Sequence, residues 1–410
     1  MKVIELAHVM AGPVCGLMLA DMGADVIKVE KVPGGDDTRL MTPPEIDGEA
    51  AAFLMMNRNK RGMAINLKTA AGKALLLRML ETADVVIENF RAGTMERLGL
   101  GYEDLKKTNA GLIYCAISGF GRNGPYASRY CAISGFGRNG PYASRGGFDL
   151  IAQGMSGLMS MTGEGPGRPP CKVGAPVTDI TAGILAAMAV SAAYAHKLKT
   201  GEGQMVDTSL FEAGITHTYW QSAIALATGE APVPMGSAHP LNGPYQAFET
   251  ADGWITVGAA NHANWLRLTE AVGRPDLAED ERFLDNAGRM ANLAALGDIL
   301  SEIFRTRRQS EWLDILENAG VPAGPVLDVC EMHQDPHALA REMVVETNHS
   351  RLGPVQTIGC PVKFSKTPSA INSGAPVYGE HTRAILSEYG IKDDDVEDLI
   401  TSGAVVAAEK

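Results

Sequence analysis

The first 118 residues alternate between short apolar runs and helix-like segments, and this order constrains the fold more than any other feature of the chain. Apolar runs at 3–6 and 25–29 flank a segment that Gly12-Pro13 opens and Gly23 ends. Proline near the start and glycine just past the end are typical of a helix. Strand, helix and strand in this order predict a β-α-β unit.

The same alternation continues toward the middle of the chain. Thr69 precedes a segment whose apolar residues at 75, 76, 79 and 80 share one helical face, and VVIENF then predicts a strand. GLIYCAIS at 111–118 predicts another strand, and MVDTSL follows a long Ala-rich helix. Alternating strands and helices predict an α/β fold with a parallel, doubly wound sheet.

The composition changes near residue 230, where proline and glycine become frequent. Residues 263–319 then predict several amphipathic helices that contain Trp265 and Trp312. A chain of 410 residues is expected to form two or three domains. We therefore expect a large domain that begins with 1–225, a smaller α+β domain at 226–330, and a C-terminal return to the large domain at 331–410.

The bulk composition narrows the class of partner. Hydrophobic residues make up 45% and charged residues 20% of the chain, and the net charge is -12 at pH 7. This acidic balance argues against nucleic acid as a partner, although a small anion needs only a local basic cluster. Ile184 to Ala195, the most apolar stretch, is too short to span a bilayer and predicts a buried helix, so we expect no membrane partner.

The six cysteines contain no C-x-x-C pair, and no histidines occur at zinc spacing. We interpret them as buried free thiols of a reducing compartment, and we expect no metal site. The N-terminal residues lack the pattern of a secretory signal, so a cytoplasmic location is expected. G-x-G-x-x-G after the first strand, Walker A and G-x-S-x-G are all absent, which weakens dehydrogenase, NTPase and α/β-hydrolase interpretations.

Nine short segments together resemble one known family, and the resemblance extends from about residue 2 to 390. They are HVMAGPVCG, MGADVIKVE, NRNKRGMAINLK, DVVIENFRAGTMERLGLGYEDL, SGFGRNGPY, GAPVTDITAG, TGEGQMVDTSL, GVPAGPV and GEHT. The family is the class III CoA transferases (CaiB/BaiF), which includes formyl-CoA transferase. The resemblance implies a Rossmann-like, CoA-binding large domain, a small domain and an interlocked homodimer. It also implies acyl-CoA and a free carboxylic acid as substrates, with no tightly bound cofactor.

Asp179, in GAPVTDITAG, stands at the start of the Ala-rich helix, where a carboxylate is expected to cap the helix. The resemblance implies that Asp179 is also the nucleophile. The two roles are compatible, because a helix N-terminus is expected to keep the carboxylate ionised at neutral pH. Its attack on a thioester would give a mixed anhydride, and the released thiolate would convert this anhydride into an aspartyl-CoA thioester that passes CoA to the acceptor acid.

The resemblance also implies a set of CoA-binding residues. Phosphate contacts are expected from two cations, and the other members would line the first loop or flank adenine and pantetheine. These residues are Lys31 and Arg97 for phosphate, and His8, Met10, Ala11, Ile65, Lys68, Asn89 and Phe90 for the remainder. Asn89-Phe90 follows a buried strand, and the carboxyl ends of parallel strands form the ligand crevice of open α/β sheets.

Other positions carry weaker expectations. Arg58, Lys60 and Arg61 form a basic cluster, for which both a phosphate-facing role of at least one member and a solvated surface role stay open. His239 is expected to be a structural residue of a loop that resembles the family's active-site loop, and the absence of that loop's four glycines argues against oxalate as a substrate. His381 is expected to cap a helix.

Phe148 bears on the choice of reaction. The resembling α-methylacyl-CoA racemases carry histidine there as a proton-transfer base, and phenylalanine cannot move a proton. We expect Phe148 to pack in the core. The alternatives to a CoA transferase are therefore a racemase-like isomerase, which would exchange α-hydrogen with solvent, and an inactive CoA-binding protein.

The segment YCAISGFGRNGPYASR occupies 114–129 and recurs unchanged at 130–145. One perfect tandem copy differs from the many approximate copies of a solenoid and indicates a recent duplication or an artefact. Only one copy can occupy the strand position in the sheet. Tyr114 to Ser118 continue an apolar run and are expected to be that strand, so residues 122–142 are expected to form an irregular excursion.

Deleting 130–145 is expected to raise stability and to leave activity equal or higher. The entropic cost of the longer loop is expected to be on the order of 1–2 kcal/mol, and the second copy would add the cost of exposing Cys131, Ile133 and Phe136. Urea denaturation and CoA-transfer assays of the deletion variant test this. A variant that fails to fold or loses activity would show that the second copy is an integrated part of the structure.

Overall fold

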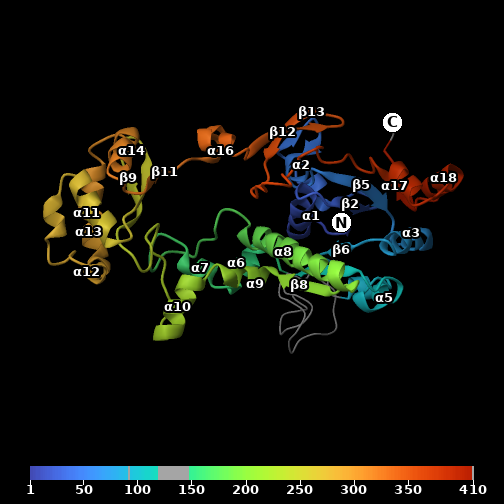
Figure 1. Cartoon of the computed structure of the whole chain (residues 1–410), viewed down its shortest axis with the longest axis horizontal. Coiled ribbons are helices and arrows are strands. Elements are labelled where there is room, and N and C mark those ends of the chain that lie inside the picture. The colour runs from blue at the N-terminus through green and yellow to red at the C-terminus, as the bar shows by residue number, and fades with distance from the viewer. Residues whose placement is uncertain (91–92, 119–146, 409–410) are drawn as a thin grey trace. The chain divides into compact units, whose positions relative to one another are not determined.

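The computed structural model describes residues 1–90, 93–118 and 147–408 of the chain. The excursion predicted for 122–142 lies outside these residues. The strand predicted for the first copy of the repeat is confirmed, because β7 (Ile113–Ser118) lies in the central sheet and all six of its residues are buried (Figure 1).

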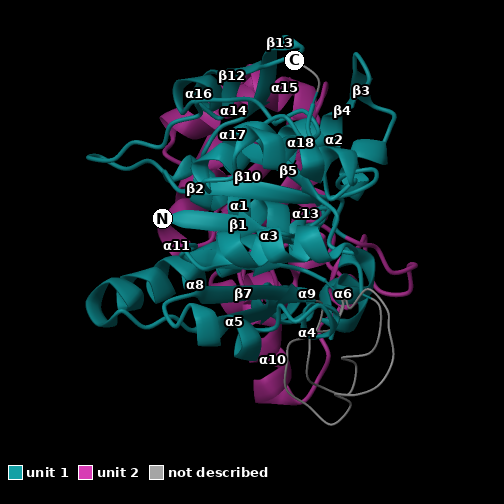
Figure 2. Ribbon diagram, turned by 90° about the vertical axis from the view of Figure 1, so that its right-hand side faces the viewer, with its two compact units in different colours: residues 1–158, 173–217, 336–410 teal, residues 159–172, 218–335 magenta. Residues whose placement is uncertain are grey.

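The chain divides into two compact units, which Figure 2 shows in two colours. Unit 1 comprises Met1–Leu158, Val173–His217 and Pro336–Lys410, and unit 2 comprises Met159–Lys172 and Thr218–Asp335. These bounds lie within ten residues of the boundaries expected at 225 and 331. They differ in one respect, because Met159–Lys172 groups with the second unit rather than with the first.

A seven-stranded sheet forms the centre of unit 1, in the order β14-β5-β2-β1-β6-β7-β8. All neighbouring pairs are parallel except β14 with β5. Among the six parallel strands the order follows the 3-2-1-4-5-6 pattern of nucleotide-binding sheets, so the strand order reverses between β1 and β6. The strands are β1 (Lys2–Glu5), β2 (Asp25–Lys31), β5 (Lys60–Ile65), β6 (Val85–Glu88), β7 (Ile113–Ser118), β8 (Met205–Ser209) and β14 (Val405–Val406).

Helices cover both faces of this sheet (Figure 1). Because side chains alternate along a strand, Val3 and Ile4 of β1 belong to different hydrophobic clusters on opposite faces. One face packs against α3 (Ala70–Leu80), α5 (Tyr102–Thr108), α17 (Thr382–Glu388) and α18 (Asp393–Thr401). The other packs against α1 (Ala11–Asp21), α6 (Asp149–Met155), α8 (Val177–Thr200) and α9 (Leu210–Thr216).

The α3 helix matches its predicted pattern. The Thr69 hydroxyl accepts a hydrogen bond from the Gly72 amide at 3.0 Å, which caps the helix. The apolar residues predicted to share one face are all buried against the sheet, namely Leu75, Leu76, Met79 and Leu80. The sequence prediction for this helix is therefore confirmed.

The α8 helix is longer than the apolar stretch suggested, because it spans the 24 residues Val177–Thr200 and has Gly201 as its C-cap. It is the one described helix whose length and composition would allow it to cross a membrane. Ala182, Ala186 and Val190 are buried in the cluster on one face of the sheet. Ile184 and Met188 are exposed, so the expected buried helix has only one buried face.

Unit 2 contains a three-stranded antiparallel sheet in the order β11-β10-β9. Its core includes Trp265 and Trp312, as the amphipathic pattern predicted, and Phe304 packs at 5.1 Å from the Trp312 ring. The main elements are β9 (Tyr245–Glu249), β10 (Trp254–Gly258), β11 (Ala323–Pro325), α10 (Tyr219–Thr228), α11 (His262–Ala271), α12 (Asn286–Ala291), α13 (Leu293–Phe304) and α14 (Gln309–Asn318).

Two smaller expectations need correction. His381 stands at the N-cap position of α17 as expected, but its side chain does not cap the helix, because its Nδ1 instead accepts a hydrogen bond from the Gly62 amide at 3.1 Å. The described cysteines are free thiols, as expected, but Cys171 and Cys330 are exposed rather than buried.

A buried network of charges joins side chains of β1, β2 and β5 to Asp36, which follows β2. The Lys28 ammonium lies 3.0 Å from Glu5 and 2.8 Å from Asp36, and Lys60 lies 2.9 Å from the other oxygen of Glu5. All four side chains are inaccessible to solvent. Because these charges depend on one another for compensation, the network fixes how β1, β2 and β5 and the Asp36 turn meet.

Replacing Lys28 with methionine is expected to lower the free energy of unfolding by about 3–5 kcal/mol, because Glu5 and Asp36 would remain buried beside an apolar side chain. The matched control is Lys106→Met, which removes a half-exposed lysine paired with Glu103. Its cost is expected to stay within about 0.5 kcal/mol. Urea denaturation measures both, and equal costs would contradict a structural role for the network.

Candidate active site

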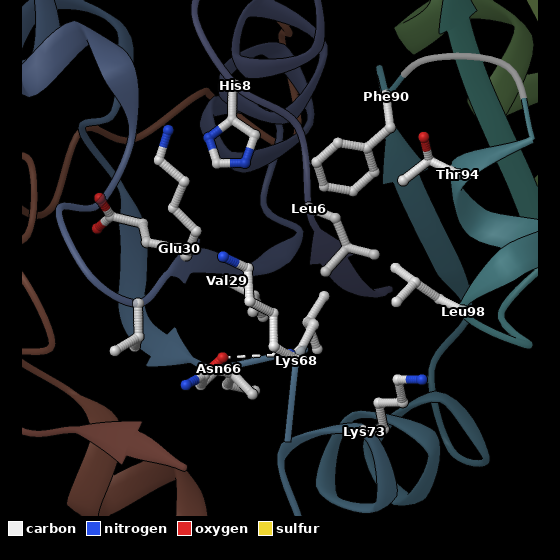
Figure 3. Close-up of a pocket in the computed structure, with 14 residues that line it drawn as sticks. Leu6, His8, Val29, Glu30, Asn66, Lys68, Lys73, Phe90, Thr94 and Leu98 are labelled. Carbon is white, nitrogen blue, oxygen red and sulfur yellow. Dashed lines mark hydrogen bonds between the residues drawn. The ribbon is translucent and has the colours of Figure 1, made fainter. Parts of the chain in front are cut away.

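A pocket of about 510 Å³ opens at the carboxyl ends of β1, β2, β5 and β6, where the strand order reverses (Figure 3). This is the position at which open α/β sheets bind ligands. Its walls are mostly apolar, and its polar groups include three lysines. The lining residues are Leu6, His8, Val29, Glu30, Lys31, Val32, Ile65, Asn66, Leu67, Lys68, Lys73, Phe90, Thr94 and Leu98.

The structure brings five of the nine predicted CoA-binding residues into this pocket, namely His8, Lys31, Ile65, Lys68 and Phe90. His8 and Phe90 follow adjacent strands, and their ring centroids lie 5.5 Å apart. Figure 3 shows this pair on one side and Asn66, Lys68 and Lys73 on the other. A planar aromatic group can stack on such rings, and the lysines can meet negative charge.

The three lysines differ in their partners. Lys31 forms an ion pair with Asp37, whereas Lys68 is exposed and Lys73 is half-exposed, and neither forms an ion pair with another described residue. Lys73 was missed by the sequence analysis, although its place in the first turns of the helix after β5 puts it at the carboxyl edge of the sheet. Lys68 and Lys73 therefore offer the less compensated charge for an anionic ligand.

The other four predicted residues surround the pocket without lining it. Asn89 holds the His8 backbone from both sides, because its side chain accepts from the His8 amide at 2.9 Å and donates to the His8 carbonyl at 2.7 Å. Arg97 is exposed and donates to the hydroxyl of Thr94, which does line the pocket, at 3.0 Å. Met10 and Ala11 form the start of α1.

The loop that carries His8 is fixed by the buried charge network. The Asp36 carboxylate accepts a hydrogen bond from the Val9 amide at 3.1 Å, and Val9 adopts a left-handed φ of 67°. Lys28 beside Asp36 holds the pKa of that carboxyl well below its usual range, so the acceptor stays charged. Burial and the nearby Lys28 lower the pKa of His8, which keeps its imidazole neutral at pH 7.

The first turns of α1 and α8 lie in direct contact, and this contact links the pocket loop to Asp179. A Cβ atom at Gly183 would lie 2.6 Å from the Ala11 carbonyl oxygen, so only glycine allows this approach. Gly183 lies one turn beyond Asp179 in α8, and Ala11 is the first residue of α1. The predicted nucleophile and the loop residues therefore lie on neighbouring helix ends in unit 1.

Asp179 occupies the third position of α8, behind Pro176 at the N-cap. The expectation that it caps the helix is therefore wrong, and its carboxylate makes no hydrogen bond to another residue in the part of the chain that the structure describes. Burial and the nearby Asp149 carboxylate raise the pKa of Asp179 to about 7. The expectation that the helix end keeps it fully ionised at neutral pH is also wrong.

The helix is instead capped by Asp149, which comes from α6. One Asp149 oxygen accepts from the Thr178 amide at 3.0 Å and from the Thr178 hydroxyl at 2.8 Å. Its other oxygen accepts from the buried Gln153 amide group at 2.7 Å. Two carboxylates thus lie at the start of α8: Asp149 of α6 accepts hydrogen bonds with both oxygens, whereas Asp179 of α8 is available for chemistry.

Several other expectations are corrected by the structure. Phe148, at the start of α6, is 62% exposed and does not pack in the core of the chain. The basic cluster does not reach the pocket, because Arg58 pairs with Asp21, Lys60 with Glu5, and Arg61 with Asp25 and Glu388. These charges hold strands and helices together instead of meeting phosphate.

His239 lies in a loop of unit 2 that is fixed by its own contacts. Its Nδ1 accepts from the Leu241 amide at 3.1 Å, and its ring stacks on Tyr245 with centroids 5.2 Å apart. The buried Arg289 donates to the Gly243 carbonyl at 2.7 Å in the same loop. These contacts agree with the structural role expected for His239.

A Rossmann-type sheet with a pocket that contains three lysines at its switch point is suited to binding an anionic ligand. Comparison with known proteins gives the family. The family model for CoA-transferase family III matches residues 1–129 and 130–382, and the chain belongs to this family. It is accordingly a CoA-transferase. The two matched stretches meet at the boundary between the two copies of the repeat.

Individual relatives cover almost the whole chain. A succinate–glutarate CoA-transferase of Agrobacterium fabrum is 40% identical over 94% of this chain and 94% of its own length. A succinyl-CoA:mesaconate CoA-transferase of Haloarcula marismortui is 39% identical over 95% of this chain and 96% of its own. The crystal structure of a CaiB/BaiF family protein from Brucella suis has a TM-score of 0.81 at 39% identity, and the match covers 95% of this chain and 98% of that one.

Lys68→Ala and Lys73→Ala are each expected to weaken CoA binding and to reduce its dependence on salt, because both remove positive charge that salt screens. The control is Lys107→Ala, on α5, which does not line the pocket. Titration calorimetry at low and high salt measures the dissociation constants. Wild-type affinity and salt dependence in both pocket variants would show that these lysines do not bind CoA. Arg97→Ala tests in the same way whether the residue at the edge of the pocket contributes.

Proposed function

We propose that this enzyme moves CoA from succinyl-CoA, or a similar dicarboxylic thioester, to a second carboxylic acid, with Asp179 as the nucleophile. The available Asp179 carboxylate at the start of α8, one turn from the contact with α1, is the observation that carries this proposal. The names of the two relatives reported above support succinyl-CoA as the donor.

The raised pKa of Asp179 suits a nucleophile. A carboxylate that is poorly solvated is more reactive than one in water, and a pKa of about 7 leaves roughly half of the groups ionised at neutral pH. The ionised fraction rises with pH, so the first step is favoured above pH 7. Acylation of Asp179 also removes its negative charge, and with it the repulsion between Asp179 and Asp149.

The reaction conserves the energy of the thioester in four steps. An Asp179 oxygen attacks the donor carbonyl and expels CoA thiolate, which gives a mixed anhydride. The thiolate attacks the Asp179 carbonyl and releases the donor as a carboxylate, which leaves an aspartyl-CoA thioester. The acceptor carboxylate attacks this thioester and expels CoA thiolate again. The thiolate finally attacks the acceptor carbonyl, which gives the new CoA ester and regenerates the Asp179 carboxylate.

The pocket supports binding of CoA itself. We infer that His8 and Phe90 contact the adenine and that Lys31, Lys68 and Lys73 meet the phosphates. A volume of about 510 Å³ accommodates part of a molecule as long as CoA. The remainder would extend along the loop at Val9 and Met10 toward the start of α8.

Asp179→Ala and Asp179→Asn are both expected to lose CoA transfer by at least about 10³-fold while they keep the fold, because neither side chain can form the anhydride. The assay is exchange of isotope-labelled succinate into succinyl-CoA, followed by mass spectrometry, which requires no knowledge of the acceptor. Asp280→Asn, a partly exposed carboxylate of unit 2 paired with Arg282, is the control. Wild-type exchange by either Asp179 variant would show that the nucleophile is another group.

We also propose that the enzyme is a homodimer. The outer face of α8 exposes Ile184 and Met188, and α6 exposes Leu150, Ile151 and Met155. In unit 2, the apolar helix α10 has no buried residue and exposes Tyr219, Trp220 and Leu226. Large apolar surfaces of this kind are typical of subunit interfaces.

Light scattering is expected to give a mass of twice the 43.4 kDa of one chain. Met188→Lys is expected to weaken the dimer, because it places a charge on the apolar face of α8, whereas Lys107→Ala is expected to leave it intact. A single-chain mass for the wild type at micromolar concentration would contradict the proposal.

A further inference from the structure

Asp149 takes no part in the transfer steps, yet it bonds to Thr178, the residue directly before Asp179. Three donors converge on its carboxylate, which are the Thr178 amide, the Thr178 hydroxyl and the Gln153 side-chain amide, at 3.0, 2.8 and 2.7 Å. A carboxylate that accepts three hydrogen bonds is held in one orientation. The Asp149 carboxylate is therefore fixed in position beside the first turn of α8.

The surroundings of Asp149 are rigid. Gln153 is buried, and its oxygen accepts from the Val173 amide at 2.9 Å, which ties the segment entering α8 to α6. A Cβ at Gly214 of α9 would lie 2.4 Å from the Ser156 hydroxyl and 3.3 Å from the Thr178 methyl group. Three helices thus meet at the Asp149–Thr178 contact with no spare space.

We propose that Asp149 is a positioning residue of the transfer reaction, which orients the first turn of α8 and favours the covalent Asp179 intermediates over the free Asp179 carboxylate. The proposal rests on the proposed function of Asp179. Its physical basis is that two neighbouring carboxylates repel each other, whereas an anhydride or a thioester at Asp179 is neutral. The repulsion is relieved when Asp179 is acylated and returns when the product leaves.

Other titratable groups on the elements packed against α8 do not share this role. They are Cys15 and Asp21 of α1, Tyr114 and Cys115 of β7, Asp207 of β8, Glu212 of α9, and His217, which bonds to Thr181. Those on α8 beyond Asp179 are Tyr194, His196, Lys197 and Lys199 in its last two turns. Among the described residues, Asp149 is the one charged group that shifts the pKa of Asp179.

The test is the pH dependence of kcat/KM for label exchange by the wild type and by Asp149→Asn. With a pKa of about 7 for Asp179, the wild-type value is expected to rise about tenfold from pH 6 to pH 8. The value of kcat/KM rises with pH because Asp179 must lose its proton before it can attack the thioester. Without the Asp149 charge this rise is expected to shrink to less than about threefold, and the covalent enzyme trapped with succinyl-CoA is expected to decrease.

Two further variants separate charge from structure. Asp149→Glu keeps the charge and is expected to retain the wild-type pH rise. Thr178→Val removes one donor to Asp149 and is expected to lower thermal stability without changing the pH rise. An Asp149→Asn enzyme with a wild-type pH rise and undiminished covalent enzyme would overturn the proposal, even where Asp179→Asn is inactive. Full activity of Asp179→Asn would instead overturn the proposed function.

Discussion

The buried ion network of Glu5, Lys28, Asp36 and Lys60 is the interaction on which the rest of unit 1 depends. Buried charges stabilise a fold only weakly against apolar replacements, but they allow a single arrangement of their partners. Here they connect three central strands to the turn that holds Val9 in a left-handed conformation. The position of the pocket loop is thus determined by the buried charge network and not by contacts within the loop itself.

From this fixed loop the chain enters α1, and α1 meets α8 without space for a side chain at Gly183. Asp149 caps the start of α8. The turn that carries Asp179 is therefore held by Asp149 on one side and by the contact with α1 on the other. An apolar pocket with cationic groups and an incompletely solvated carboxylate are thereby kept in one rigid unit. This arrangement explains how a protein with a net charge of -12 can bind a polyanionic thioester.

The sequence predicted the strands and helices well, because apolar periodicity and capping residues such as Thr69 act locally. The family resemblance placed five pocket residues, and for Phe90 the sequence itself supplied a reason, since the carboxyl ends of parallel strands form the ligand crevice and Phe90 follows a buried strand. The sequence predictions failed where contacts with residues distant in sequence determine the environment of a side chain. Lys60 appears basic in sequence but is neutralised inside the sheet by Glu5, and the pKa of Asp179 depends on Asp149, 30 residues away in the sequence. Burial of this kind has no local signature.

The central claim is that Asp179 carries CoA covalently during transfer. Intact-protein mass spectrometry after rapid mixing with succinyl-CoA, followed by peptide mapping, tests it directly. The account predicts a mass increase equal to CoA less one water, located on the peptide that contains Asp179, lost on addition of acceptor acid and absent from Asp179→Asn. Transfer without any adduct on that peptide, or an adduct on another residue, would contradict it.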